Sequence, residues 1–130
     1  MAGTTSKGQV AAAISNAIVA IYSKHYGKGP TRAKTYLLDD VVVTVMQDTF
    51  TTVERTLIDA GKGETVREVR TTFQYAMRSE FTDAVRAATG REPRGFLSQV
   101  DWHTDTAIEV FLLADGDDGH AVSDITNDTS

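Results

Sequence analysis

The stretch Arg32-Ala-Lys-Thr-Tyr-Leu-Leu-Asp-Asp-Val-Val-Val-Thr-Val-Met-Gln47 decides the fold. It contains two strand-like runs, 32–38 and 41–47, separated only by Asp39-Asp40. So short a connection predicts an antiparallel hairpin, because parallel strands need a much longer crossover. Side chains alternate along a strand, so the odd-numbered valines of the second run are expected on one face: Val41, Val43 and Val45.

Amphipathic helical patterns flank this hairpin. Apolar residues recur at three- and four-residue spacing from about residue 6 to 25 and predict a first helix. A candidate capping box of Thr51 and Glu54 predicts a short helix, and a second one of Thr65 and Glu68 predicts a long helix through about residue 88. Alternating residues at 94–100 and 106–113 then predict a second hairpin.

The expected fold is therefore α+β, with an antiparallel sheet of two hairpins packed against about three helices in the order α-ββ-α-α-ββ. Residues 1–113 carry thirteen basic and thirteen acidic residues, whereas 114–130 carry five Asp and no base. We expect residues 1–113 to form a single domain and 114–130 to be an acidic flexible tail. A calcium-binding loop at 115–119 is the less favoured alternative, because the EF-hand spacing and closing Glu are missing.

Composition narrows the function classes. The chain has no cysteine, which excludes disulfides and thiolate zinc sites. Its three histidines are isolated, so neither a metal site nor a cofactor is expected. No window approaches about 20 apolar residues and no signal peptide precedes the first helix, so we expect a cytoplasmic protein without direct membrane insertion. A neutral domain with an acidic tail gives nucleic-acid binding no electrostatic support.

The segment 25–32 is the first candidate binding element. Gly27 and Gly29 allow positive φ, Pro30 fixes its own φ, and Tyr26, Lys28 and Arg32 supply side chains for a ligand or partner. The favoured interpretation is a glycine stop of the first helix. The alternative is a basic turn that binds an anion; the Walker and dinucleotide spacings are both absent.

The long helix and the last turn hold the other candidates. Arg67, Arg70 and Arg78 follow helical steps, with Gln74 between them, beside an apolar face of Val66, Val69, Phe73 and Met77. In the favoured interpretation these arginines form a solvated stripe with weak local ion pairs. In the alternative they lie near the basic turn, where their guanidinium groups bind a carboxylate, bicarbonate, phosphate or the acidic loop of a partner. Trp102 either anchors a partner or folds over the end of the sheet. His103 between Asp101 and Asp105 is read as a turn rather than a tuned base.

Several separated stretches resemble the MpsC-like domains of a sodium-translocating membrane-potential-generating system. They are 25–32, Tyr36-Leu-Leu-Asp-Asp-Val-Val-Val43, Thr52-Val-Glu-Arg-Thr-Leu57, Val66-Arg-Glu-Val-Arg70, Met77-Arg-Ser-Glu-Phe81, Phe96-Leu-Ser-Gln-Val-Asp101 and Val110-Phe-Leu-Leu113. The resemblance covers roughly residues 8–113. It implies a small cytoplasmic protein, peripheral to the membrane through a partner, in a system that handles cations or inorganic carbon. It carries over no catalytic residues.

Two function classes follow. The first is a non-enzymatic accessory or regulatory module that docks on a protein partner, with self-association, as a dimer, through the long helix. The second is a small-anion or ligand-binding domain that uses the basic turn and the helix arginines. No catalytic motif favours an enzyme: Ser79 and Ser98, for example, lack a nucleophile-elbow context.

Overall fold

The computed structural model describes residues 6–115. A four-stranded antiparallel sheet forms one layer, with strands β1 (Arg32–Leu38), β2 (Val41–Gln47), β3 (Pro93–Asp101) and β4 (Thr106–Leu113). The strand order is β1-β2-β4-β3, so the two hairpins join side by side through β2 and β4. Both predicted hairpins are confirmed. Of the predicted acidic tail, residues 116–130 lie outside the described part of the chain.

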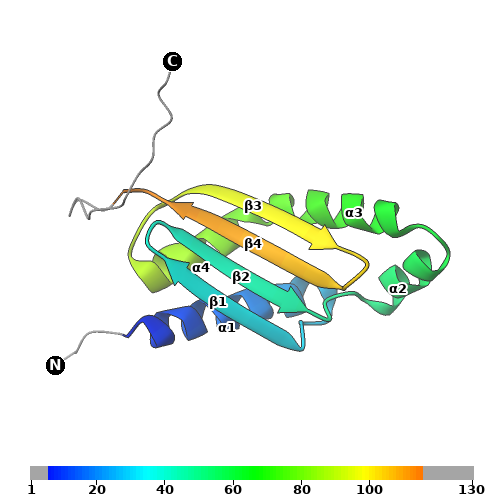
Figure 1. The fold of residues 1–130 in the computed structure, drawn as a ribbon, viewed down its shortest axis with the longest axis horizontal. Helices are drawn as coiled ribbons and strands as arrows, with labels where there is room; N and C mark the ends of the chain where they lie inside the picture. Colours follow the sequence, from blue (N-terminus) through cyan, green and yellow to red (C-terminus); the bar gives the residue numbers. More distant parts are fainter. Residues whose placement is uncertain (1–5, 116–130) are drawn as a thin grey trace, which may run out of the picture.

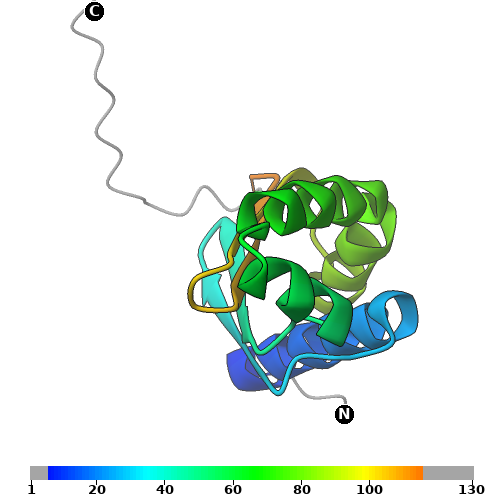
Figure 2. The same cartoon turned by 90° about the vertical axis from the view of Figure 1, so that its right-hand side faces the viewer.

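Four helices form the second layer: α1 (Lys7–Tyr26), α2 (Thr52–Asp59), α3 (Gly63–Ala76) and α4 (Arg78–Thr89). Seen along the sheet edge, these helices lie on one side of the strands (Figure 2). Helix α1 packs against β1 and α4, while α3 runs behind β3 (Figure 1). The opposite face of the sheet is covered by no element among residues 6–115. The α+β class is therefore confirmed.

The long helix predicted over residues 65–88 is in fact two helices that meet at Met77. The Met77 backbone has φ −96° and ψ 13°, and its N–H bonds to both Phe73 O and Gln74 O. The Met77 side chain is buried, so the bend is held by packing and requires no glycine or proline. The bend lets α3 follow the sheet while α4 packs on α1.

The prediction of a second capping box, at Thr65 and Glu68, is also wrong. Helix α3 begins at Gly63, two residues before Thr65, and has no side-chain hydrogen bond at its N-terminus. Gly63 is buried beneath the Trp102 ring, so close that an added Cβ would lie 2.4 Å from the indole. Tertiary packing thus sets the start of this helix. The first capping box is confirmed: the Thr51 hydroxyl accepts from Glu54 N and Glu54 Oε1 accepts from Thr51 N.

The core lies between the layers. Strands β2 and β4 supply Val42, Met46, Ala107 and Phe111, and the helices supply residues that face them. The helical contribution comes mainly from α1 and α4, through Ile14, Ile18, Tyr22, Phe81 and Val85. Apolar burial is the main favourable term in folding, and here it fixes the two hairpins against the helices.

Candidate functional site

The basic turn does end the first helix. Gly27 has φ 73°, and its N–H bonds to Ser23 O at 3.0 Å. Glycine has no Cβ to strain this left-handed conformation, so the favoured interpretation of the turn as a helix stop is confirmed. Gly29 is held close to α1, because a Cβ there would lie 2.4 Å from the Ser23 hydroxyl. Pro30 is half-buried between the helix and β1.

The cations of the turn point in different directions. Lys28 Nζ lies 3.4 Å from Asp48 Oδ1 and donates to Asp48 O at 2.9 Å. Asp48 also pairs with Arg55, which in turn pairs with Asp105 at 2.7 Å. Lys28 therefore ties the turn to the segments that follow β2 and precede β4. Arg32 lies on β1, exposed, and makes no ion pair within residues 6–115.

Arg70 occupies the interior between α2 and α3. Its side chain is fully buried, and Nε and Nη2 bind the two oxygens of Glu54 at 2.7 and 2.8 Å. Nη2 also donates to Thr49 O at 2.7 Å. The guanidinium carbon lies 3.8 Å from the centre of the Tyr26 ring, a cation–π contact. Burial raises the pKa of Glu54, but the hydrogen bonds from Arg70 and Thr51 and the charge of Arg70 together outweigh it and hold that pKa below its usual value.

Tyr26 and Arg70 are the two predicted site residues that the structure brings into contact. Their setting is a closed polar cluster rather than an open basic pocket. From Tyr26, the hydroxyl donates to Gln74 Oε1 at 3.1 Å, and Gln74 Nε2 donates to Glu109 Oε2 at 2.6 Å and to the Tyr22 hydroxyl. The Tyr22 hydroxyl in turn donates to Glu109 Oε2 at 2.5 Å. We call these six residues the Arg70 network: Tyr22, Tyr26, Glu54, Arg70, Gln74 and Glu109.

Glu109 is the unexpected member. It is fully buried on β4, and burial raises its pKa to about 7, partly opposed by the hydrogen bond from Tyr22 and by the charge of Arg70. Glu109 Oε1 and the hydroxyl of Ser98, its register partner on β3, are both buried without a hydrogen-bond partner among residues 6–115. Burial therefore favours the neutral acid, whereas the hydrogen bonds to Glu109 and the charge of Arg70 favour the ionised form.

The division of the long helix into polar and apolar faces was wrong. Arg70 and Gln74 share the buried face with Val66 and Met77, whereas Val69 is 61% exposed. The sequence of β4 did contain a signal for the burial of Glu109, because Glu109 alternates with Ala107 and Phe111 and must lie on the same face of the sheet as they do. It was ambiguous because the opposite set, Ile108, Val110 and Leu112, is equally apolar.

The remaining candidates lie apart from this network. Arg67 pairs with Glu64 at 2.9 Å, and the Trp102 indole N–H donates to the same carboxylate at 3.3 Å. Trp102 stacks on His103 and covers Gly63, so it folds back on the start of α3. Arg78 is exposed at the start of α4 and makes no ion pair in the described part of the chain. The structure thus does not gather Lys28, Arg32, Arg70 and Arg78 around one pocket, and their role as an anion site stays a prediction.

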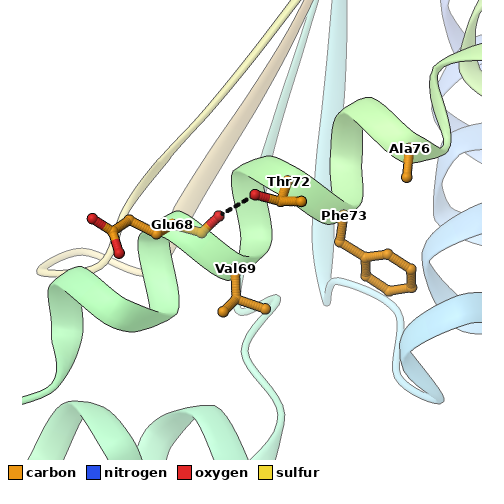
Figure 3. A pocket seen from close by; sticks show the side chains of 5 residues that line it. All are labelled: Glu68, Val69, Thr72, Phe73 and Ala76. Carbon is orange, nitrogen blue, oxygen red and sulfur yellow. Dashed lines mark hydrogen bonds between the residues drawn. The ribbon is translucent and has the colours of Figure 1, made fainter.

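A groove of about 390 Å³ runs along the outer side of α3. Its lining is almost wholly apolar, and Val69 and Phe73 project from the same side of the helix (Figure 3). The Phe73 ring at the bottom of the groove is held in place by two edge-on contacts. Its centroid lies 5.0 Å from that of the Tyr26 ring and 6.1 Å from that of the His25 ring. We call this feature the α3 groove and define it by its lining residues: Glu68, Val69, Thr72, Phe73 and Ala76.

Residues 6–115 match the family model of MpsC. The chain belongs to the MpsC family. This family is described as a Na⁺-translocating membrane potential-generating system, which gives the MpsC chain a role in such a system. Comparison with curated proteins gave no match, and neither did comparison with solved structures. Within residues 6–115, no helix of this MpsC chain is long and apolar enough to cross a bilayer.

Proposed function

We propose that the chain is a non-enzymatic accessory module of the membrane-potential-generating system and docks on a protein partner through the α3 groove. Membership of the MpsC family supports a role in the membrane-potential-generating system, and the α3 groove is the surface proposed to contact the partner. The observation that carries the proposal is Val69, whose side chain is 61% exposed at the edge of an apolar groove. Exposed apolar patches rimmed by polar residues mark protein interaction sites and ligand-binding grooves, and Glu68 and Thr72 lie at the edge of this one.

The groove also indicates the chemistry of its occupant. Phe73 and Ala76 offer apolar surface, while Glu68 lies at the wall and makes no ion pair within the described residues. A partner segment with one or two apolar anchors, followed by a Lys or Arg that reaches Glu68, satisfies both features. This pattern is typical of an amphipathic helix that lays its apolar side into a groove.

The test is co-purification of the full chain with the membrane subunits of the system, co-expressed and extracted in detergent. Val69→Glu places a charge in the apolar wall, so we expect at least a tenfold loss of bound subunit, equivalent to about 1.4 kcal/mol. Thr65→Glu is the matched control, because Thr65 is exposed on the same helix and does not line the groove. Wild-type recovery with Val69→Glu, or no recovery with the wild type, contradicts the proposal.

The small-anion alternative makes a different prediction. Lys28 and Arg70 already hold carboxylates, at 3.4 and 2.7 Å, so an added anion must compete with Asp48 or Glu54. Isothermal titration with bicarbonate and with inorganic phosphate distinguishes the two functions. Saturable binding that Arg32→Ala or Arg78→Ala abolishes would favour the anion-binding function and would leave the docking function unsupported.

A further inference from the structure

The uncovered face of the sheet is far less polar than a solvated face should be. In antiparallel sheets with one covered side, outward positions are normally polar. Here the outward residues of the two central strands are almost all aliphatic, and the flanking strands add large exposed side chains. Leu38 is 57% exposed, Leu97 55%, Tyr36 43% and Ile108 37%. Four strands of such residues form one continuous apolar surface.

The register arranges this face in four rows, each crossing β1, β2, β4 and β3 in that order. The first row is Leu38, Val41, Leu112 and Gly95, and the second is Tyr36, Val43, Val110 and Leu97. The third row is Lys34, Val45, Ile108 and Gln99, and the fourth is Arg32, Gln47, Thr106 and Asp101. The first two rows are wholly apolar. The fourth is polar, with a cation at the β1 edge and an anion at the β3 edge.

We propose that this face binds a second copy of the chain, face to face, about a two-fold axis parallel to the strands. Such an axis exchanges the two edges of the sheet and keeps each row opposite itself. Arg32 of one copy then faces Asp101 of the other, Lys34 faces Gln99, and Tyr36 faces Leu97. The apolar rows meet apolar rows, so charge and polarity are complementary across the whole face.

Other symmetric arrangements lack this match. A two-fold axis perpendicular to the strands would place the fourth row on the first, so that Arg32 would be buried against Leu38 without a partner. An uncompensated charge against apolar surface is strongly disfavoured. Both axes keep the strands of the two sheets nearly aligned, the common geometry of packed sheets, so the match of the rows decides between them.

The size of the face suits a dimer. Four strands about 4.8 Å apart and seven residues long at about 3.4 Å each give a face of roughly 450 Å² in projection. Two such faces cover about 900 Å² in projection, and their side chains make the true surface somewhat larger. The total buried accessible area is therefore about 1,000 Å², the lower bound of a specific interface. This interface is separate from the α3 groove, which lies on the helical side, so either proposal can fail alone.

Sedimentation equilibrium of the full chain over a range of concentrations tests the dimer. We expect twice the chain mass of 14.1 kDa, and Leu97→Glu should raise the dissociation constant by an order of magnitude or more. Val53→Glu is the matched control, since it places the same charge at an exposed residue of α2, on the helical side of the molecule and outside the α3 groove. A monomeric wild type, or a dimer unaffected by Leu97→Glu, overturns the proposal and leaves the face to a different partner.

A charge exchange tests the axis. Arg32→Asp and Asp101→Arg should each weaken the dimer, and the double variant should recover most of the wild-type affinity. Because the chain has no cysteine, Tyr36→Cys with Leu97→Cys adds an independent test. Packed sheets are about 10 Å apart, so a bismaleimide of that length should cross-link two chains at this pair, whereas Val69→Cys should stay uncross-linked. Circular dichroism confirms folding of each variant. Efficient cross-linking at Val69 alone would refute the interface.

Discussion

Glu109→Gln is the sharpest test of the Arg70 network. The change keeps the shape of the side chain and removes its ability to ionise. In the wild type the side chain is fully buried with a pKa of about 7, compared with 4.5 for an exposed glutamate. The folded chain therefore holds a proton that the unfolded chain has already released over the pH range between these values. Stability must fall as pH rises through this range.

The size of the effect follows from the shift. One unit of pKa corresponds to about 1.4 kcal/mol, so the full shift amounts to about 3 kcal/mol. Most of this loss occurs between pH 5 and pH 8. Glutamine does not titrate, and its amide oxygen can still accept from Tyr22 and Gln74 as Oε2 of Glu109 does. Relative to the wild type, Glu109→Gln should therefore gain about 2 to 3 kcal/mol between pH 5 and pH 8.

Urea unfolding at one fixed chain concentration, followed by the fluorescence of Trp102, measures this difference. The difference between variant and wild type at each pH cancels the titration of all groups that the two proteins share. Ser98→Ala provides a control for packing, because it removes a hydroxyl from the same site and leaves the carboxyl in place. A stability difference that stays constant from pH 5 to pH 8 would show that Glu109 does not hold a proton in the folded protein.

Three further changes test local features. Arg70→Met leaves Glu54 without its partner and should lower the free energy of unfolding in urea by about 3 to 5 kcal/mol. The double variant Glu54→Gln with Arg70→Met should lose less than the sum of the two single variants. Additive losses would show that the two side chains do not interact. Gly63→Ala pushes a Cβ into Trp102 and should cost about 1 to 3 kcal/mol with a red-shifted emission spectrum; an unchanged spectrum would show that the ring does not cover this glycine. Gly27→Ala has open space but φ 73°, so we expect a loss of about 1 kcal/mol in thermal unfolding, whereas Gly27→Asn should be nearly neutral.

Local signals predicted the sheet. Both hairpins have turns shorter than six residues, so their pairing depends on neighbours in sequence, and β1, β2 and β4 have the bounds that alternation gave. Gly27 likewise ends α1 through its own conformation. The bend at Met77 was missed because the apolar spacing continues through it. Only the three-dimensional packing of α3 and α4 decides that the chain turns there.

The candidate site was harder to predict because the residues that form it come from four elements, α1, α2, α3 and β4. Arg70 and Gln74 look like part of a solvated stripe when α3 is read alone, and nothing local says that Tyr22 and Glu109 complete the polar cluster. A polar residue at a buried helix position is stable only if distant groups satisfy it. Its burial is therefore a property of the assembled fold, and no periodicity within one element reveals it.

Glu54 belongs both to the capping box that the sequence predicted and to the buried network that it did not predict. Glu54 caps α2 through Thr51 and also binds Arg70, so one carboxylate fixes a helix start and compensates a buried charge. Its side chain keeps 15% of its surface in contact with solvent, whereas Glu109 keeps none. Of the two acids near this guanidinium, Glu54, which is nearer water and accepts from more donors, has a lowered pKa, whereas the fully buried Glu109 has a raised one. The network thus consists of an ion pair beside α2 and, on β4, an acid whose pKa burial raises to about 7, with Gln74 and the two tyrosines between them.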